Sequence, residues 1–475
     1  MRRRKLMLMA ASGIGLSQLS QYAFSDPRSS ANPGSPIIPD ASDMGPIRAM
    51  ASVDWASGLA DTSPMVFGCN DYEVMTPEKA ADREFQAQMA KIDFRLLRLH
   101  NSTMSDRWSS QALRRWDPDK VMAAFQAASY LRTRAVVQNI PNWTQWMQKD
   151  DVGRLHESEV DRYAQFCADL VQLLNIRQQR KIKYWEPINE AEPVYERAGS
   201  LDRLWGIFNR AAVAMKQVDP TILIGGPVIS WSDPQQMRSF LVHSHRHTDF
   251  LSWHRYATGN PRMASDRLMT QTSEYGKDVV RFRRMGREFG PQALPLFLSE
   301  YNLNYDWKAG ETRHHGHIGA VWFASVLKHL AENQVDMAAV WHTKDNIYGL
   351  LDSTDKARPA AKLYEWCLDY MVGKTVATDT NHPMVEAWAV EQAGGDRNVV
   401  LINKAAGPAV VKLSWPIDGR YEEPMELLYL NHAGNQAFSY DVFALQEESF
   451  SLLPHSLLLL RLKKRSGGEE GPGVG

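Results

Sequence analysis

Cysteine is scarce in this 475-residue chain, which holds only three. Cys69, Cys167 and Cys367 are odd in number and far apart, and the last two lie in helical patterns. Neither a disulfide framework nor the paired spacing of a zinc site is therefore expected. An excess of charge of one sign is also lacking, since the formal net charge is -1 and the folded part has no basic run. This balance argues against nucleic acid as a partner, because nucleic-acid binders carry a basic patch.

Long apolar runs are absent after the N-terminus, so no segment of the mature chain is expected to span or anchor in a membrane. The N-terminus itself carries Arg2-Arg3-Arg4-Lys5, an apolar run up to Ala11, and Ala23-Phe24-Ser25 with small residues at both positions that matter for cleavage. The pattern predicts a signal peptide over residues 1–25. Arg3-Arg4-Lys5-Leu6 resembles a twin-arginine export signal, and an ordinary Sec signal is an equal alternative. We expect a soluble periplasmic or extracellular protein.

The middle of the chain alternates between strand-like and helix-like segments. Residues 26–50 are rich in Pro, Ser, Ala and Gly and predict a linker. Over residues 51–371 we expect strands at 64–68, 94–100, 134–140, 184–190, 221–227, 249–256, 294–302 and 335–343, with helices including 77–91, 121–131, 157–174, 201–218, 277–289, 318–331 and 359–371. Eight strands, each followed by a helix, predict an α/β fold, a (β/α)8 TIM barrel.

The character of the chain changes beyond Val372. Short apolar runs are separated there by Gly, Pro and Asn turns, without a helix of comparable strength. The pattern predicts a C-terminal β-sandwich over residues 372–464. The Gly-rich end of the chain, residues 465–475, is expected to be disordered.

Two of the predicted barrel strands end in carboxylates. Strand four ends in Asn189-Glu190 and strand seven brings Glu300 to its end. Barrel enzymes do their chemistry at the C-terminal ends of their strands, so both glutamates are candidate catalytic residues. An Asn-Glu pair alone is a weak signal; its weight here comes from the matching position of Glu300.

Strand alternation indicates which other side chains face the barrel interior. The alternation predicts four inward faces, each apolar at first and polar or aromatic at its C-terminal end: Leu96, Arg98 and His100; Phe250, Ser252, His254 and Tyr256; Leu296, Leu298 and Glu300; Met337, Ala339 and Trp341. Strand four is the exception, because strict alternation would send Asn189 and Glu190 to opposite sides. We predict a bulge or bend near Ile188 that lets both face the cleft. Glu186, inside the strand, is expected to be buried beside an arginine.

Two carboxylates amid Arg, His, Tyr and Trp suit glycoside hydrolysis, in which one protonates the leaving oxygen and the other attacks the anomeric carbon or activates water. The sequences Arg98-Leu99-His100, Trp185 to Glu190, Trp253 to Tyr256 and Ser299 to Asn302 resemble the retaining glycoside hydrolases of clan A. They are most similar to family 39, the group of β-xylosidases, α-iduronidases and exopolysaccharide-cleaving enzymes. The resemblance covers about residues 51–464, because that family also carries a C-terminal β-sandwich.

The resemblance implies a role for each matched residue. Glu190 would be the acid/base, with a raised pKa, and Glu300 the nucleophile. Asn189 would bind the sugar 2-hydroxyl, and Arg98 and Tyr256 would hold Glu300 ionised. The further candidates for the sugar-binding subsite are His100, His254, Trp341, Asn142 and Trp143.

One departure from the family pattern is Ala191-Glu192-Pro193, where Asn-Glu-Pro is more usual. Glu192 is expected either to shape a positive subsite or to face solvent. Four loop tryptophans, Trp143, Trp146, Trp231 and Trp307, are candidate sugar platforms or simple packing residues.

Neither a metal nor another cofactor is expected. The histidine groups around His245 (His243, His245, His247) and His315 (His314, His315, His317) lack an evident three-ligand design, and Gly225-Gly226 lacks a phosphate-loop spacing. The sequence therefore predicts a secreted retaining glycosidase acting on a polysaccharide or its fragments. Endo action on an exopolysaccharide and exo action as a β-xylosidase both remain open. A carbohydrate-binding or polysaccharide-biosynthesis accessory protein without turnover is the alternative of another class.

Overall fold

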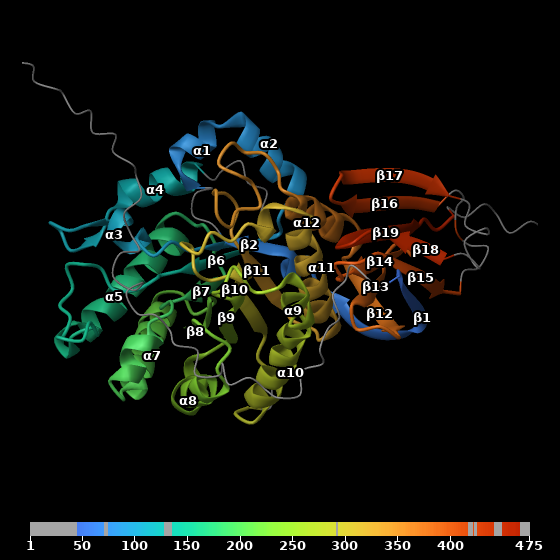
Figure 1. Ribbon diagram of the computed structural model, residues 1–475. Coiled ribbons are helices and arrows are strands. Elements are labelled where there is room, and N and C mark those ends of the chain that lie inside the picture. The colour runs from blue at the N-terminus through green and yellow to red at the C-terminus, as the bar shows by residue number, and fades with distance from the viewer. Residues whose placement is uncertain are drawn as a thin grey trace, which may run out of the picture.

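The computed structural model describes residues 45–70, 75–127, 135–290, 293–416, 421, 425–440 and 449–465. Eight parallel strands close into a barrel that is surrounded by helices, and a nine-stranded sheet lies beside it (Figure 1). The (β/α)8 prediction is confirmed. The predicted signal peptide, the first part of the linker and almost all of the predicted tail lie outside the described residues. None of the helices within the described ranges is long and apolar enough to cross a membrane.

The eight barrel strands coincide closely with the predicted ones. They are β2 (Gly68–Asn70), β3 (Leu96–Leu99), β6 (Ala135–Asn139), β7 (Tyr184–Glu186), β8 (Leu223–Ile229), β9 (Phe250–Thr258), β10 (Leu296–Asn304) and β11 (Met337–Trp341). The first strand begins later than expected, because Pro64–Phe67 form a 3-10 turn that Ser63 caps by accepting a hydrogen bond from the amide of Met65. Proline fits the start of a helical turn, where its missing N–H is not needed.

Among the described residues, the longer helices that accompany the barrel are α2 (Arg83–Ile92), α4 (Pro118–Ala127), α5 (Val160–Val171), α7 (Leu201–Val218), α8 (Pro234–Ser244), α10 (Ser273–Arg287), α11 (His317–Glu332) and α12 (Pro359–Tyr370). The shorter helices are α1 (Pro77–Ala81), α3 (Met104–Trp108), α6 (Glu192–Arg197) and α9 (Ser265–Thr270). The single helix expected over residues 77–91 is two helices, because Asp82 caps α2 by accepting a hydrogen bond from the amide of Phe85.

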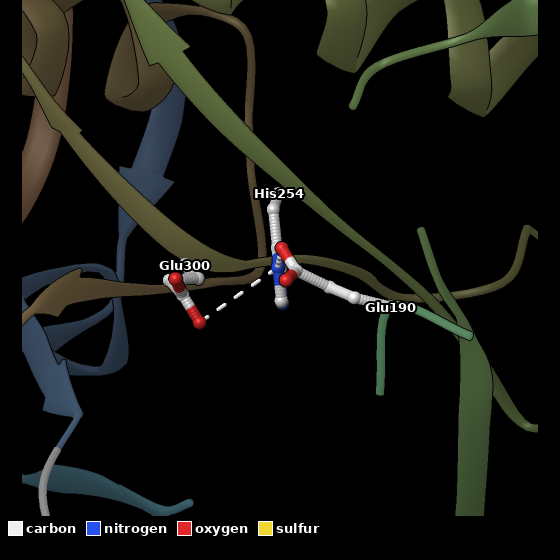
Figure 2. Close-up of side chains that lie close together, drawn as sticks. All are labelled: Glu190, His254 and Glu300. Atoms are coloured by element: carbon white, nitrogen blue, oxygen red, sulfur yellow. Dashed lines mark hydrogen bonds and ion pairs between the residues drawn. The ribbon is translucent and has the colours of Figure 1, made fainter. Parts of the chain in front are cut away.

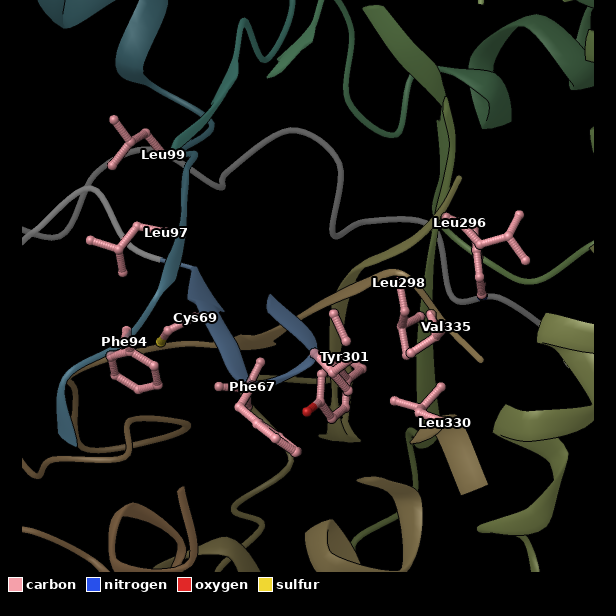
Figure 3. Close-up of a cluster of buried hydrophobic side chains, with 14 of the residues drawn as sticks. Phe67, Cys69, Phe94, Leu97, Leu99, Leu296, Leu298, Tyr301, Leu330 and Val335 are labelled. Carbon is pink, nitrogen blue, oxygen red and sulfur yellow. The ribbon is translucent and has the colours of Figure 1, made fainter. Parts of the chain in front are cut away.

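The predicted inward faces agree with the structure except in β10. The interior is filled as predicted by Leu96, Phe250, Met337 and Ala339. In β10, however, the interior residue is Phe297, while Leu296 and Leu298 pack between the strands and the surrounding helices (Figure 3). The prediction that these two leucines share the face of Glu300 is therefore wrong.

A bulge in β10 explains this difference. The pairing with β9 shifts between Leu298 and Glu300, so that Leu298 lies opposite Trp253 and Glu300 lies opposite His254. The extra residue, Ser299, reverses the alternation and returns Glu300 to the interior.

The strand β1 (Ile47–Thr62) belongs to the C-terminal sheet. It pairs antiparallel with β12 (Gly373–Thr380) and parallel with β15 (Ala409–Ser414), and Figure 1 shows it in blue among the orange and red strands. Residues 47–50, expected in the linker, and residues 51–62, expected in the barrel domain, are thus part of this sheet. Buried and exposed side chains alternate along the first half of β1, and the buried ones, Ala49, Ala51 and Val53, lie in the core of the sheet domain.

The predicted β-rich region after the barrel is confirmed, but its strands form one mixed sheet rather than two facing sheets. The other strands are β13 (Val385–Glu391), β14 (Arg397–Asn403), β16 (Met425–Asn431), β17 (Gly434–Tyr440), β18 (Ser449–Leu452) and β19 (Ser456–Leu462), in the order β17-β16-β19-β14-β13-β12-β1-β15-β18. The sheet curls, so that one of its faces encloses a core of its own and the other packs on the barrel domain. In β14, Val399 and Leu401 enter the first core, whereas Val400 and Ile402 join the second.

Candidate active site

Arg98 is the centre of a buried network that joins four barrel strands. It lies in β3, and its side chain is fully buried. Its Nε donates to Glu186 at 2.7 Å, Nη1 donates to Asn70 at 2.9 Å, and Nη2 donates to Asn189 at 2.6 Å. Nη1 also lies 3.6 Å from a carboxylate oxygen of Glu300. The expected pairing of Glu186 with an arginine is confirmed, and it compensates two charges that would be costly to bury separately.

Asn70, at the end of β2, supports the bulge that directs Glu300 inward. Its Nδ2 donates to the backbone oxygen of Ser299 at 2.7 Å and to that of Ala339 at 3.0 Å, while its Oδ1 accepts from Arg98. Asn70 is not among the predicted site residues, because the predicted first strand ends at Gly68 whereas β2 continues to Asn70. Recognising that the strand continues to Asn70 would have put an amide beside Arg98.

The predicted irregularity before Glu190 is confirmed. Strand β7 ends at Glu186, and Glu190 adopts a left-handed conformation with φ of 46°. The amide of Glu190 donates to the backbone oxygen of Val228 at 3.0 Å, which ties the turn to the end of β8. Because a guanidinium only donates hydrogen bonds, Asn189 must present its oxygen to Arg98, and its NH2 group is left to donate. Asn189 and Glu190 therefore both lie at the mouth of the barrel.

His254, from β9, lies between the two candidate catalytic carboxylates (Figure 2). Its Nδ1 is 2.7 Å from Oε1 of Glu190 and 3.7 Å from Oε2 of Glu300. Burial lowers the pKa of His254 to about 4, and the charge of Glu300 opposes this shift. The ring is therefore neutral near pH 7, and it can exchange one hydrogen bond with Glu190 whether that carboxyl is protonated or ionised.

The two carboxylates have different surroundings. Partial burial at the mouth of the barrel raises the pKa of Glu190 to about 7, against the opposing charge of Arg98. Burial also raises the pKa of Glu300, although the charge of Arg98 and a hydrogen bond donated by the Tyr256 hydroxyl favour its ionised form. The expected support of Glu300 by Arg98 and Tyr256 is thus present, but desolvation outweighs it. Glu190, whose side chain is 36% exposed, receives neither the hydroxyl nor the close guanidinium.

The geometry also bears on metal binding. Glu190, His254 and Glu300 each offer one ligand atom within 4.8 Å of the others, and they are the one such group among the described residues. Ligands of tetrahedral zinc lie about 3.5 Å apart, given bonds of about 2.1 Å, so the group would have to contract to hold this ion. The two histidine groups of the sequence, around His245 and His315, form no such set of ligands among the described residues. In the first group, His243 and His245 each have Nδ1 within 2.9 Å of a backbone oxygen four residues earlier.

His100 and Trp341 form one wall of the mouth. The ring centroids are 5.6 Å apart. Nδ1 of His100 lies 2.8 Å from Oδ1 of Asn139, and since that oxygen only accepts, Nδ1 carries the proton. Burial and the charge of Arg98 hold the pKa of His100 well below its usual range. His100 thus has an unprotonated Nε2, which can accept a hydrogen bond from a hydroxyl group.

The predicted aromatic platforms divide into two kinds. Trp143 packs edge-on against Tyr163 and Tyr195, with centroids 5.9 and 6.0 Å away, and Trp146 packs edge-on against Phe166. These rings contribute to packing. Trp231 and Trp307, in contrast, are 44% and 40% exposed.

Asn142, a further predicted sugar ligand, has no hydrogen bond to either carboxylate among the described residues. Its Oδ1 is buried without a hydrogen-bond partner there.

Glu192 is buried, so of the two alternatives for this residue, shaping a positive subsite or facing solvent, the second is wrong. Its carboxylate accepts hydrogen bonds from the amide of Ser230 at 2.7 Å and from the Ser230 hydroxyl at 2.5 Å. Burial raises the pKa of Glu192 to about 7, and the bonds from Ser230 oppose this shift. The contact fixes the loop after β7 to the loop after β8, beside Glu190.

Proteins of known structure share the fold of this chain. No family model and no curated protein sequence matches the chain. In structure it is similar to a monomeric β-xylosidase from Caulobacter crescentus, with 14% identity, a TM-score of 0.63, and coverage of 88% of this chain and 100% of that one. It is also similar to a family 39 glycoside hydrolase from Xanthomonas axonopodis, with 15% identity, a TM-score of 0.63, and coverage of 90% and 100%.

A family 51 α-L-arabinofuranosidase from Thermotoga petrophila gives 13% identity, a TM-score of 0.66, and coverage of 87% and 100%. The chain shares its fold with glycoside hydrolases. At these identities the likeness establishes the fold alone, and it does not separate family 39 from family 51.

Proposed function

We propose that this protein is a retaining glycoside hydrolase, with Glu190 as acid/base and Glu300 as nucleophile, acting on an oligosaccharide or polysaccharide. The observation that carries the proposal is the pair of carboxylates on opposite sides of His254, with oxygens within 4.8 Å of each other. Retaining enzymes hold their carboxyl groups about 5–5.5 Å apart, whereas inverting enzymes leave about 6.5–9.5 Å for a water molecule. The short separation therefore supports direct attack by one carboxylate.

The hydrogen-bond donors support the division of roles. Glu300 receives the Tyr256 hydroxyl and lies 3.6 Å from Arg98, so it is the carboxylate that is better stabilised in the ionised form that attack requires. Glu190, with a pKa of about 7, can hold a proton near neutrality. The remaining carbohydrate contacts come from the acceptor Nε2 of His100 and the donor NH2 of Asn189.

In the first step an oxygen of Glu300 forms a bond to the anomeric carbon, the bond from that carbon to the leaving oxygen breaks, and the Glu190 proton moves to the leaving oxygen. In the second step Glu190 takes a proton from water, the water oxygen bonds to the anomeric carbon, and the ester bond to Glu300 breaks. Each step inverts the anomeric centre, so the product retains the configuration of the substrate.

Azide rescue tests both roles at once. Wild type is first screened on 4-nitrophenyl β-xyloside, α-L-arabinofuranoside, β-glucoside and β-cellobioside, and on a panel of polysaccharides. Glu190→Ala and Glu300→Gly are then assayed with azide on an aryl glycoside that wild type cleaves. Azide should attack the glycosyl-enzyme in Glu190→Ala and give a glycosyl azide of the same configuration as the substrate. In Glu300→Gly it should attack the substrate itself and give the opposite configuration.

The exposed Glu157, whose side chain is 76% accessible, supplies the control variant Glu157→Ala, which should keep wild-type rates. Loss of the general acid should cost about 10²- to 10⁴-fold on a substrate with a poor leaving group. A first product of inverted configuration from wild type would contradict the two-step mechanism. Sugar binding without any turnover would favour the accessory-protein alternative.

We also propose export to the periplasm or the cell exterior, on the basis of the N-terminal pattern of residues 1–25. Cell fractionation of the full chain, compared with a variant in which Arg3 and Arg4 are both replaced by Lys, tests export and its twin-arginine form. Endo action and exo action are distinguished by the first products released from a polysaccharide: mixed oligosaccharides indicate endo action, and a single small sugar indicates exo action.

A further inference from the structure

Two exposed aromatic side chains stand together at the rim of the barrel mouth. Trp231 follows β8 and Tyr305 follows β10, and each is 44% exposed. Their ring centroids are 6.2 Å apart and the ring planes meet at 88°. The two rings come from loops separated by more than 70 residues and still meet, so they form one contiguous exposed aromatic surface rather than two scattered side chains.

The backbone holds this pair in place. The amide of Tyr305 donates to the backbone oxygen of Thr258 at 3.0 Å, and the backbone oxygen of Tyr305 accepts from the hydroxyl of Tyr348 at 3.1 Å. At Gly259 a Cβ atom would lie 2.2 Å from the Tyr305 ring, so only glycine leaves room for this ring position. The corner formed by Trp231 and Tyr305 is therefore built into the ends of three adjacent strands.

Trp231 lies beside the turn that carries Glu190, whereas Tyr305 follows β10, the strand that carries Glu300. Ser230, the neighbour of Trp231, donates two hydrogen bonds to Glu192, which is two residues from Glu190. The acid in glycoside hydrolysis stands beside the leaving oxygen. A ring that binds near Trp231 is thus on the leaving-group side of the scissile bond.

We propose that Trp231 and Tyr305 form a stacking platform for a sugar ring of the leaving group. This inference rests on the proposed function and extends it, because it assigns the substrate class: a saccharide that continues on the leaving-group side, as in an oligosaccharide or a polysaccharide. The C–H face of a pyranose ring stacks on an aromatic face, and a right-angled pair offers one ring face and one ring edge to the same sugar.

The first test is binding, which does not need turnover. Wild type, Trp231→Ala and Tyr305→Ala are run in native gels containing arabinoxylan, xyloglucan, galactomannan, xanthan or dextran. At least one polysaccharide should retard wild type, and both alanine variants should weaken that retardation about tenfold, which is about 1.4 kcal/mol. Trp231→Phe and Tyr305→Phe, which keep a ring, should largely restore it.

Val280→Ala is the control, because Val280 is 54% exposed on the helix α10 and has no place in the site. This variant should bind like wild type. Thermal unfolding of all variants shows whether an alanine variant has lost its fold. In that case Trp231→Leu and Tyr305→Leu, which remove the ring and keep apolar bulk, take its place and should weaken retardation relative to Val280→Ala.

A comparison of kcat/KM on two substrates distinguishes a loss of sugar binding at the platform from a loss of catalysis at Glu190 and Glu300. A glycosyl fluoride has no leaving-group ring, so its kcat/KM should be unchanged in Trp231→Ala, while kcat/KM on the oligosaccharide of the same sugar should fall about tenfold. Equal losses on both substrates, or no polysaccharide retardation of wild type, would overturn the platform. Retardation that depends on Trp231 without hydrolysis of any glycoside would instead overturn the proposed function and leave the platform standing.

Discussion

Replacing Tyr256 by Phe removes the hydroxyl that donates to Glu300 and leaves the ring in place. A hydrogen bond to a charged group contributes about 1.5–3 kcal/mol, and one pKa unit corresponds to about 1.36 kcal/mol, so the expected rise in the pKa of Glu300 is about 1–2 units. Water at the open mouth can replace part of the lost bond, so we expect about 1 unit.

The sign of the effect on the rate follows from the role of Glu300. Attack needs the ionised carboxylate, so activity falls as the pH drops through the pKa of Glu300, and a higher pKa moves this acid limb to higher pH. Glu190 must be protonated for the first step, so the alkaline limb should lie near its pKa of about 7 and should stay in place. The assay is the pH dependence of kcat/KM on an activated aryl glycoside, which reports groups of the free enzyme.

Tyr348→Phe is the control for this experiment. Its hydroxyl is also close to the site, but it donates to the backbone oxygen of Tyr305 rather than to a carboxylate. The acid limb of this variant should match that of wild type. If Tyr256→Phe leaves the acid limb unchanged, the support of Glu300 by Tyr256 is refuted. If the alkaline limb moves instead, the roles of Glu190 and Glu300 are exchanged.

Substitutions at two further positions test the surroundings of the site and the contact between the domains. Glu192→Leu should lower the free energy of unfolding by about 1 kcal/mol, because it leaves the half-buried donors of Ser230 without an acceptor, whereas Glu192→Gln should lower it less; equal losses in urea unfolding would argue against this contact. Glu386, in β13, accepts from Lys404 at 2.5 Å and lies 3.1 Å from His329 of α11, and these bonds and charges hold its pKa below its usual range despite burial. Glu386→Gln should lower the free energy of unfolding by about 3–5 kcal/mol near pH 7. The difference in this free energy between variant and wild type should shrink as the pH falls through the lowered pKa of Glu386. A difference that stays constant down to acid pH would contradict this account.

The barrel and its candidate site were accessible from the sequence because the relevant signals are local. Each strand is a short apolar run, and His254, Tyr256 and Trp341 share faces with Phe250 and Ala339 by simple alternation, as the structure bears out. Glu300 lies in the mouth of the barrel, as alternation along its strand predicts. The agreement does not come from strict alternation, however, because the bulge at Ser299 reverses the alternation in β10.

Such bulges are set by partners distant in the chain. Asn70 bonds the oxygen of Ser299 across 229 residues, and no local pattern around Leu296 to Glu300 contains that information. The burial of Glu192 likewise depends on Ser230, which is brought beside it by the pairing of β7 and β8.

By itself, the sequence determined the barrel count, the two carboxylates and the break in alternation before Glu190, because strand periodicity and the placement of polar residues at strand ends are properties of single segments. Only the tertiary structure decided which domain β1 joins, how one sheet replaces a sandwich, and where His254 stands between the carboxylates. These features arise from pairings between segments far apart in the chain. Their energies depend on burial and partners that exist only after the chain has folded.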